Sequence, residues 1–434
     1  MSIKIPAEEI EISEEVDLLV IGGGAAGCAA AITGARLGLR TSLIEEMPYL
    51  GGMSTGGSVG TLCGLYMQNP GGEVEPLTGG FPSEIAQALL GRNDAIGPIP
   101  YRDTAVLPYV PVGLKRAFEE RVRAESRLRV RLHAKLVHAE VEAGEVRGVV
   151  VQTREARIGL RARVYIDASG DAVLSRMAGA PIIEGEELQY PSMMFTMQNV
   201  DVGKAIGNLA KLPEILEAHY ESDGLPRKSG NLIPTGRPGE IIVALSRLEF
   251  EGRPVDAALE HELTWAELEG RQQAQHLSEF LRDKVPGFTE AFLADYAARL
   301  GVRETRKIVG EYVLREDDVL GAKDFKDGIG RSAWPIERHV AGGETFWRFL
   351  DPGQWYAIPY RCLVPKGVSN LLVAGRCLSA ESAAFASVRV LGPCMLEGQA
   401  VAAAAQRMIE DQTSGAQVDV DRLRAELAGL GVPL

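Results

Sequence analysis

The chain has 434 residues, 46% of them hydrophobic, and this length favours two or three folding units. Its 46 Lys and Arg against 59 Asp and Glu give a formal net charge of −13, which disfavours nucleic acid or an anionic membrane surface as a partner. The acidic N-terminus lacks the features of a secretory signal, and no apolar stretch resembles a membrane span of ~20 residues. We therefore expect a soluble, cytoplasmic protein.

The first elements in chain order are a strand, a helix and a second strand. Residues 17–21 form an apolar run rich in β-forming residues, an Ala- and Leu-rich stretch follows to residue 37, and a second apolar run covers residues 41–44. This order is typical of the start of a Rossmann-type domain.

Glycines with the spacing GxGxxG lie between the first strand and its helix. Gly22 permits a tight turn, Gly24 lets the backbone approach a pyrophosphate, and Gly27 lets the helix pack on the strand. The helix N-terminus then presents free N–H groups to the phosphates. Glu45, 45 − 27 = 18 residues later at the end of the second strand, can accept hydrogen bonds from a ribose. We also expect Ala25, Ala26 and Glu46 at this dinucleotide site.

A second glycine-rich segment covers residues 51–80. Its many Gly, Ser, Thr and Pro residues predict a loop held near a group that needs close backbone approach. The segment opens with Gly51, Gly52, Met53 and Ser54, and such a backbone suits the remainder of an extended cofactor. NAD dehydrogenases of this architecture do not need it, so the segment favours FAD over NAD.

The later segments differ in composition and in predicted secondary structure along the chain. A helix is predicted around residues 112–126, a strand leading into a β-meander over 128–151, and a strand over 164–168. Residues 181–353 mix strands, such as 241–245, with amphipathic helices at 256–281 and 289–300. A strand at 371–374 then has the same apolar composition as the first strands, and an Ala-rich helix at 393–408 follows it.

These elements predict an α/β fold with one inserted domain. We expect a Rossmann-type FAD-binding domain, with a parallel sheet and a β-meander, interrupted by an α+β substrate domain. The predicted bounds are 1–180 for the first part of the FAD-binding domain, 181–353 for the inserted substrate or cap domain, 354–412 for the last part, and 413–434 for a C-terminal surface helix.

Several further blocks follow the ribose acid in a fixed order. They are GGMST at 51–55, DASGD at 167–171, RETR at 303–306, AGR at 374–376 and GQA at 398–400. In these blocks the sequence resembles the bacterial family of FAD-dependent oxidoreductases of the glutathione-reductase structural type. The resemblance runs from about residue 15 to 410, and it is specific for fold and cofactor but not for substrate.

The resemblance implies where the rest of FAD would bind. Residues 168–170 would close over the adenosine half, and the meander would offer backbone to the adenine. Residues 375–376 would lie by the ribityl chain and pyrophosphate, and a helix beginning near residue 393 would favour flavin reduction through its dipole. The residues implied are Leu136, Ala168, Ser169, Gly170, Gly375, Arg376 and Pro393.

Five side chains are candidates for the chemistry. Arg303 and Arg306 are three residues apart, so on a helix they would share a face and could clamp a carboxylate or phosphate, with surface ion pairs as the alternative. His339 could exchange the substrate proton, or it could be structural. Tyr360 and Arg389 lie in segments expected to flank the flavin, where they could orient a small polar substrate.

The five cysteines form no CxxC pair and no Cys/His group at zinc spacing, so we expect no metal site. Buried reduced thiols are the simplest interpretation. Cys63, Cys377 and Cys394 follow or precede segments expected near the flavin. A thiol–disulfide flavoenzyme that uses Cys63 with Cys377 or Cys394 is therefore one alternative.

The favoured function is an FAD-dependent dehydrogenase or oxidase. Hydride would pass from a small anionic or polyhydroxylated metabolite to flavin N5, and oxygen or a redox carrier would reoxidise the flavin. The chain has one GxGxxG and no second block for an NAD(P)H domain. A flavin monooxygenase using NAD(P)H is the other alternative, and a homodimer is left open. A flavoprotein that modifies RNA is disfavoured by the acidic charge.

Overall fold

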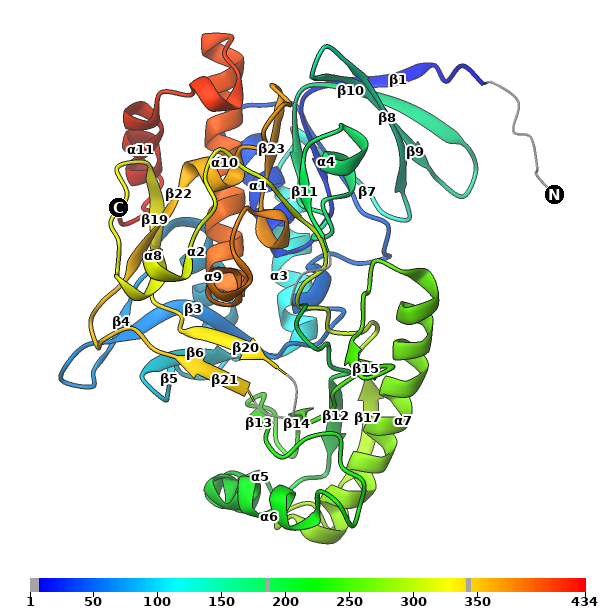
Figure 1. Ribbon diagram of the computed structural model, residues 1–434, viewed down its shortest axis with the longest axis vertical. Coiled ribbons are helices and arrows are strands. Elements are labelled where there is room, and N and C mark those ends of the chain that lie inside the picture. The colour runs from blue at the N-terminus through cyan, green and yellow to red at the C-terminus, as the bar shows by residue number, and fades with distance from the viewer. Residues whose placement is uncertain (1–7, 185–187, 341–344) are drawn as a thin grey trace.

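The computed structural model describes residues 8–184, 188–340 and 345–434. Its central sheet has the strand order β7-β2-β1-β10-β9-β8, and β23 also pairs with β10 (Figure 1). The pairs β7–β2, β2–β1, β1–β10 and β10–β23 are parallel, whereas β10–β9 and β9–β8 are antiparallel. The strands are β1 (Ile12–Ile21), β2 (Thr41–Ile44), β7 (Leu128–Arg131), β8 (Lys135–Glu142), β9 (Glu145–Gln152), β10 (Arg157–Asp167) and β23 (Leu371–Val373). The parallel sheet with a meander is the architecture that the sequence predicts.

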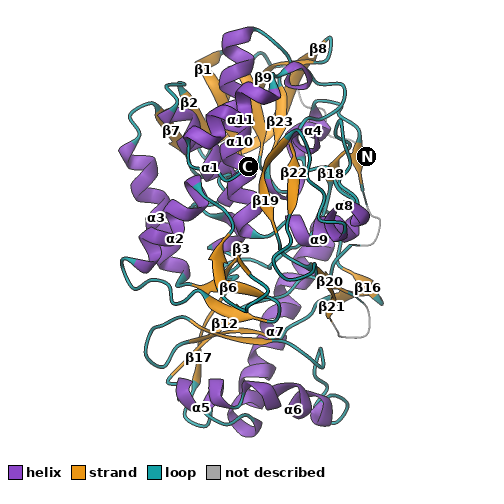
Figure 2. Ribbon diagram, turned by 90° about the vertical axis from the view of Figure 1, so that its left-hand side faces the viewer, coloured by secondary structure: helices purple, strands orange, loops and turns teal. Residues whose placement is uncertain are grey.

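Two helices from opposite ends of the chain cover one face of this sheet together. Helix α1 (Ala25–Arg36) is rich in alanine and buried along its length, and α10 (Leu391–Asp411) crosses it closely (Figure 2). A side chain on Gly398 would place its Cβ 2.1 Å from the Ala26 carbonyl oxygen, so the crossing requires glycine there. Helix α3 (Pro111–Ala124) confirms the helix predicted over 112–126.

The inserted unit has a core of its own. Its sheet has the order β13-β14-β12-β17, formed by β13 (Asn231–Pro234), β14 (Ile241–Ala244), β12 (Phe195–Gln198) and β17 (Phe292–Tyr296). The long helix α7 (Glu260–Lys284) packs beside it, with α5 (Val202–Gly207) and α6 (Leu212–His219) at the far end (Figure 1). Buried residues between 193 and 302 form one cluster, whereas Leu314, Ile336 and others before residue 353 pack into the core of the cofactor unit.

Two predicted elements are wrong. Residues 289–300 do not form a helix, because Phe292–Tyr296 pair with β12 as strand β17, and sheet pairing overrides the amphipathic spacing. Residues 51–80 are not one loop, because β3 (Thr61–Gln68) and β4 (Val74–Pro76) join the sheet β4-β3-β6-β5. The other two strands of that sheet are β5 (Ile99–Tyr101) and β6 (Thr104–Pro108).

The remaining elements are short or lie at the periphery. The two-stranded sheets pair β11 (Ile182–Ile183) with β18 (Lys307–Ile308), β15 (Glu249–Phe250) with β16 (Arg253–Pro254), β19 (Gly328–Ser332) with β22 (Tyr356–Pro359), and β20 (Ile336–His339) with β21 (Thr345–Arg348). The other helices are α2 (Gly80–Leu90), α4 (Val173–Met177), α8 (Glu316–Leu320), α9 (Ser382–Val388) and α11 (Val420–Gly429).

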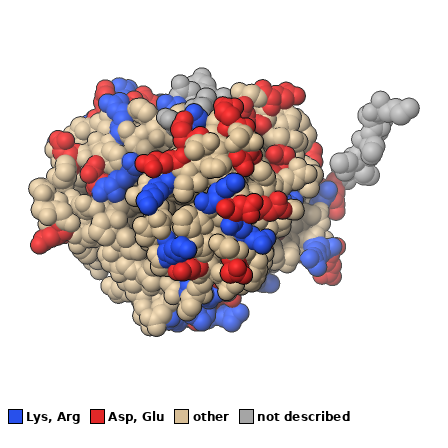
Figure 3. All heavy atoms as spheres, turned by 90° about the horizontal axis from the view of Figure 1, so that it is seen from below, with Lys and Arg blue, Asp and Glu red and all other residues tan. Residues whose placement is uncertain are grey.

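Acidic and basic side chains alternate over the face seen from below (Figure 3). Among the described residues, no helix is both long and apolar enough to cross a membrane. The prediction that the N-terminus has no secretory signal falls partly on residues 1–7, which lie outside the described residues.

Candidate active site

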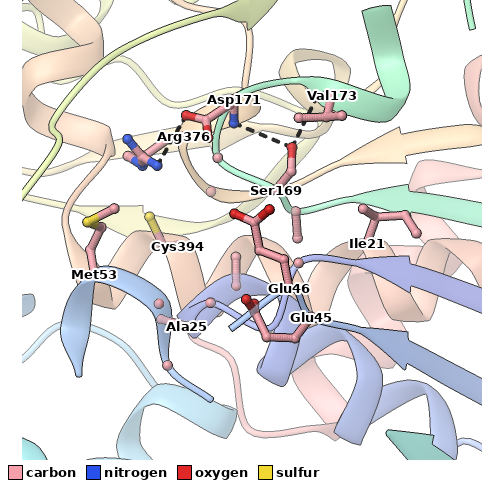
Figure 4. Close-up of a pocket in the computed structure, with 18 of the residues that line it drawn as sticks. Ile21, Ala25, Glu45, Glu46, Met53, Ser169, Asp171, Val173, Arg376 and Cys394 are labelled. Carbon is pink, nitrogen blue, oxygen red and sulfur yellow. Dashed lines mark hydrogen bonds and ion pairs between the residues drawn. The ribbon is translucent and has the colours of Figure 1, made fainter. Parts of the chain in front are cut away.

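A cavity lies at the carboxyl ends of the parallel strands. It is bounded by the turn between β1 and α1, the end of β2, residues 51–54, the loop after β10 and the segment after β23 (Figure 4). Sixteen of the eighteen residues predicted to bind the cofactor line this cavity. They are Gly22, Gly24, Ala25, Ala26, Glu45, Glu46, Gly51, Gly52, Met53, Ser54, Leu136, Ala168, Ser169, Gly170, Gly375 and Arg376.

Glycine is favoured at each of the three motif positions for a different structural reason. Gly22 has φ +96°, and a Cβ there would lie 2.5 Å from the Ala168 carbonyl oxygen. A Cβ on Gly27 would lie 1.8 Å from the Gly22 carbonyl oxygen, so this glycine serves the packing of α1 and does not line the cavity. A Cβ on Gly24 would meet no atom within 4 Å, because it would point into open space. The backbone is therefore bare where a pyrophosphate would approach.

Glu45 is held at the end of β2 by two backbone amides. Its Oε2 accepts a hydrogen bond from the Gly23 N–H at 2.6 Å, and its Oε1 accepts one from the Met47 N–H at 2.7 Å. Burial raises the pKa of this carboxyl above its usual value. Glu45 and Glu46 lie side by side near the centre of the view in Figure 4, with Cys394 and Met53 to their left. This position fits a ribose-binding acid.

A compact network shapes the loop after β10. Buried Asp167 accepts hydrogen bonds from the Ser169 N–H and hydroxyl through Oδ1, at 3.1 and 2.6 Å. The Ser169 hydroxyl in turn accepts the Val173 N–H at 3.1 Å. The Arg376 guanidinium lies 3.5 Å from the Asp171 carboxylate and donates to the Val302 carbonyl at 3.0 Å (Figure 4). Arg376 thereby ties the cofactor unit to the inserted unit.

The helix at the far end of the cavity begins earlier than predicted. Helix α10 starts at Leu391, and Leu391 and Cys394 line the cavity while Pro393 does not. Pro393 packs instead beneath Gly64 of β3, where an added Cβ would meet its Cδ at 2.7 Å. One turn further along α10, Glu397 is fully buried, and its Oε2 accepts a 2.7 Å hydrogen bond from the Gly375 N–H.

A group of four arginines lies beside the Arg389 end of the cavity, which we call the arginine cluster. Arg389 lines the cavity and precedes α10. Its positive charge acts on Arg303 and contributes to the lowered pKa of that residue. The other two members, Arg227 and Arg247, come from the inserted unit, and both act electrostatically on Arg303. No carboxylate of the described residues forms an ion pair within 4 Å with any of the four.

The arginine cluster is held mainly by neutral groups. Arg303 donates to the Tyr190 carbonyl at 2.6 Å and to the Ser192 hydroxyl at 3.0 Å, and Arg227 donates to the Thr345 hydroxyl at 3.1 Å. Arg247 donates to the Val340 carbonyl. Burial, followed by the repulsion of Arg389, lowers the pKa of Arg303 to about 9. Burial, followed by the repulsion of Arg247, lowers the pKa of Arg227 to about 10. The site thus concentrates more positive charge than the described carboxylates neutralise.

Two titratable groups of strand β20 face the arginine cluster. Burial alone would raise the pKa of Glu337, but the hydrogen bond from His339 and the charges of His339, Arg389 and Arg303 lower it to about 2. Burial, followed by the charge of Arg303, lowers the pKa of His339 to about 3. At neutral pH the imidazole is therefore neutral beside an ionised carboxylate.

A polar chain extends from Arg389 away from the cavity. The Gln189 Oε1 accepts from Arg389 at 3.4 Å, and the Gln189 amide donates to Glu304 at 3.2 Å. Glu304 forms a buried ion pair with Lys307. Because the Glu304 and Lys307 charges cancel, this pair leaves the excess charge of the arginine cluster unchanged.

Two predicted catalytic residues lie elsewhere. Residues 303–306 are not helical, so Arg306 does not share a face with Arg303, and its Nε pairs with Glu184 at 3.1 Å. The Tyr360 hydroxyl donates to the Gly415 carbonyl at 3.0 Å within the core, and Tyr360 does not line the cavity. The structure therefore brings together His339, Arg303 and Arg389, and not Arg306 or Tyr360.

The cysteines are all free and mostly buried. Burial raises the pKa of the Cys63 thiol to about 12 and raises those of Cys377 and Cys394 well above the usual range. The Cys394 thiol donates to the Arg389 carbonyl at 3.1 Å, and the Cys377 sulfur accepts the Gly170 N–H at 3.2 Å. These environments disfavour a thiolate.

Several residues of the site escaped the sequence analysis. Arg227 and Arg247 carry no local motif, and only the folding of the inserted unit brings them to Arg303. Glu337 could have been suggested by its place two residues before His339, since alternate strand residues share a face. The further cavity residues are Ile21, Ile44, Ala134, Lys135, Asp171, Val173, Arg299, Leu391 and Cys394.

The fold and the glycine-lined cavity define a dinucleotide-binding protein of the Rossmann type. The chain belongs to the FAD dependent oxidoreductase family, whose model matches residues 17–427. It is thus an FAD-dependent enzyme. The bare backbone at Gly24, the buried acid Glu45 and the cavity that joins them fit this cofactor.

Three solved structures illustrate the similarity of this chain to known proteins at low sequence identity. A geranylgeranyl bacteriochlorophyll reductase-like protein from Thermoplasma acidophilum is 14% identical, with coverage of 96% of this chain and 83% of that one, at a TM-score of 0.46. A p-nitrophenol 4-monooxygenase from Pseudomonas putida is 10% identical, with coverage of 93% and 82%, at a TM-score of 0.47. A flavin-dependent brominase is 14% identical, with coverage of 96% and 84%, at a TM-score of 0.47. No curated protein matches the chain.

Proposed function

We propose that this enzyme oxidises a small anionic metabolite that binds in the arginine cluster beside the flavin. The observation that carries the proposal is the positive charge of buried Arg227 and Arg247 and half-buried Arg303 and Arg389, with which no described carboxylate forms an ion pair. Buried charge of one sign is costly unless a partner neutralises it, so an anionic ligand is the partner that the site best fits.

The residues around the arginine cluster suit substrate oxidation. FAD bound in the cavity supplies a hydride acceptor at N5. Arg303 and Arg389 would hold the anionic group with charge-assisted hydrogen bonds and fix the C–H bond toward the cofactor. Neutral His339, with its Nε2 3.4 Å from the Glu337 carboxylate, would accept the proton that leaves the substrate hydroxyl or amine. The Glu337 carboxylate would stabilise the imidazolium so formed.

Other parts of the proposal concern the architecture and the electron acceptor. The meander β8-β9-β10 beside the parallel strands supports a cofactor domain of the glutathione-reductase type. The single GxGxxG supports entry of electrons from the organic substrate and exit to oxygen or a carrier. The predicted domain bounds 1–180, 181–353, 354–412 and 413–434 remain predictions.

A flavin monooxygenase that uses NAD(P)H is the second candidate. Reduction of the flavin by NAD(P)H is the property that separates the two candidates. The arginine cluster favours an anionic substrate under either reaction.

A steady-state screen with an artificial electron acceptor tests the proposal. Purified enzyme with excess FAD is assayed against small hydroxy acids, amino acids, neutral amines and polyols, each with dichlorophenolindophenol as the acceptor. Turnover confined to acids is the expected result. Turnover of neutral polyols or amines at equal or greater kcat/KM would contradict an anion-binding arginine cluster.

A further inference from the structure

The arginine cluster contains more positive charge than a single carboxylate would neutralise. Its four guanidinium groups face one ionised carboxylate, Glu337, and one neutral imidazole, His339. The neighbouring Glu304 and Lys307 cancel each other. The described residues thus leave an excess of about three positive charges. Such an excess favours binding of anionic groups, because charge held away from water is stable only when it is paired.

The four arginines form two pairs of different origin. Arg303 and Arg389 come from the segments beside the cofactor cavity, and the charge of Arg389 is the strongest electrostatic influence on Arg303. Arg227 and Arg247 come from the inserted unit, and the charge of Arg247 is the strongest electrostatic influence on Arg227. One pair therefore lies toward the cavity and the other lies further along strands β20 and β21, where Arg227 contacts Thr345 and Arg247 contacts Val340.

Unused donors and stacking support a ligand at both pairs. Arg227 is 6% exposed and Arg389 lines the cavity, and the Nε of each has no hydrogen-bond partner among the described residues. The Arg247 guanidinium lies over the Tyr190 ring at 3.6 Å from the centroid, which fixes its plane. Guanidinium groups held in place with free donors suit bidentate binding of carboxylate or phosphate.

We infer that the substrate carries two anionic groups, one bound by Arg303 and Arg389 and the other by Arg227 and Arg247. This inference rests on the proposed function. The shared chemistry is that of a short dicarboxylate or a phosphorylated carboxylate. The group bound at Arg389 lies nearer the cofactor, so the bond that is oxidised is adjacent to that group.

Binding to the holoenzyme tests the inference without turnover. The probes are succinate and butyrate, which have the same carbon chain and differ in one carboxylate, together with 3-phosphoglycerate and inorganic phosphate. Dissociation constants come from the change in the visible flavin spectrum and, independently, from thermal shift. Succinate or 3-phosphoglycerate should bind about tenfold or more tightly than butyrate, since a second charge-assisted contact is gained.

Variants locate the second group. Arg227→Gln should reduce the ratio of succinate to butyrate affinity toward one, and Arg227→Lys should restore part of it. Arg361→Gln is the matched control, because Arg361 pairs with Asp327 at 2.8 Å outside the arginine cluster, and it should leave the ratio unchanged. Tight binding of inorganic phosphate alone would indicate a single phosphate site and overturn the inference.

The outcomes separate this inference from the proposed function. Equal affinity for succinate and butyrate in the unmodified holoenzyme would overturn the two-group inference, and this comparison needs no variant to fold. Tighter binding of succinate than of butyrate, with no reduction of the flavin by any organic anion, would support the two-group inference and contradict the proposed oxidation.

Discussion

The imidazole Nε2 of His339 lies 3.4 Å from the Glu337 Oε1, and this pair is buried against the arginine cluster. The Nδ1 of the same imidazole lies 3.4 Å from the Thr345 hydroxyl, which also accepts a hydrogen bond from Arg227. A change of protonation at His339 would therefore reach both the carboxylate and the arginines.

This pair predicts an acid-sensitive stability. The pKa of His339 is lowered from 6.5 to about 3 on folding, so between these values the unfolded chain binds a proton that the folded chain does not. Stability is then present above pH 6.5 and is lost as the pH falls toward 3, with a slope of at most about 1.4 kcal/mol per pH unit. Urea unfolding of wild type and His339→Gln at pH 7 and pH 5 measures it. The loss between the two pH values should be smaller in the variant, and equal losses would contradict the buried neutral imidazole.

Glu397 predicts a stability change of opposite sign. Burial raises its pKa well above 4.5, and its Oε1 has no partner among the described residues. The unfolded chain releases this proton above pH 4.5 while the folded chain retains it, so stability falls as the pH rises. Glu397→Gln keeps an acceptor for the Gly375 N–H and should be about 1 kcal/mol more stable than wild type at pH 8, with less advantage at pH 5. Lower stability of the variant at both pH values would contradict a buried, protonated Glu397.

Substitutions of two motif glycines should have different effects, one on FAD affinity and the other on folding stability. Gly24→Ala places a methyl group in open space of the cavity, so the chain should fold normally and bind FAD about tenfold or more weakly. Gly27→Ala drives a methyl group into the Gly22 carbonyl and should cost about 3 kcal/mol or more of folding stability. FAD titration by fluorescence and urea unfolding of the apoprotein distinguish the two. Gly207→Ala, with no atom within 4 Å and far from the cavity, is the control. Unchanged FAD affinity in Gly24→Ala would contradict the pyrophosphate position.

Much of the cavity lining was predictable because it is local. A turn, a helix N-terminus and an acid at the end of the next strand lie within a few elements of one another, so Gly24 and Glu45 could be assigned from spacing. The arginine cluster could not be predicted from sequence spacing, because Arg227 and Arg247 come close to Arg303 only through the tertiary packing of the inserted unit. The helix predicted at 289–300 failed for a related reason, since pairing with β12 decides the conformation of residues 292–296.

Arg303 and Arg306 predict opposite outcomes despite their shared motif. Arg303→Gln removes a half-buried donor near the cavity and should lower kcat/KM for an anionic substrate about tenfold or more. Arg306→Gln breaks an ion pair with half-exposed Glu184, and should change activity less than about twofold. Rates of flavin reduction at several substrate concentrations supply the comparison. A larger effect at Arg306 would move the anion site to the segment around Glu184.

The cysteines are expected to be unreactive in the native protein. At pH 7.5 the raised pKa values of Cys63 and Cys394 keep both thiols protonated, so a disulfide reagent should label them only after unfolding. The variant Cys63→Ser should retain substrate oxidation. Rapid native labelling of Cys63 together with loss of activity in the variant would support the thiol–disulfide alternative.

The central claim is that an organic anion reduces the flavin, and the anaerobic absorption spectrum of the holoenzyme tests it most directly. NADH, NADPH and then small organic acids are added in turn while the visible flavin band is followed. The account predicts bleaching by an organic acid and little by either nicotinamide. Rapid bleaching by NAD(P)H, with no reduction by any acid, would contradict it and favour the monooxygenase.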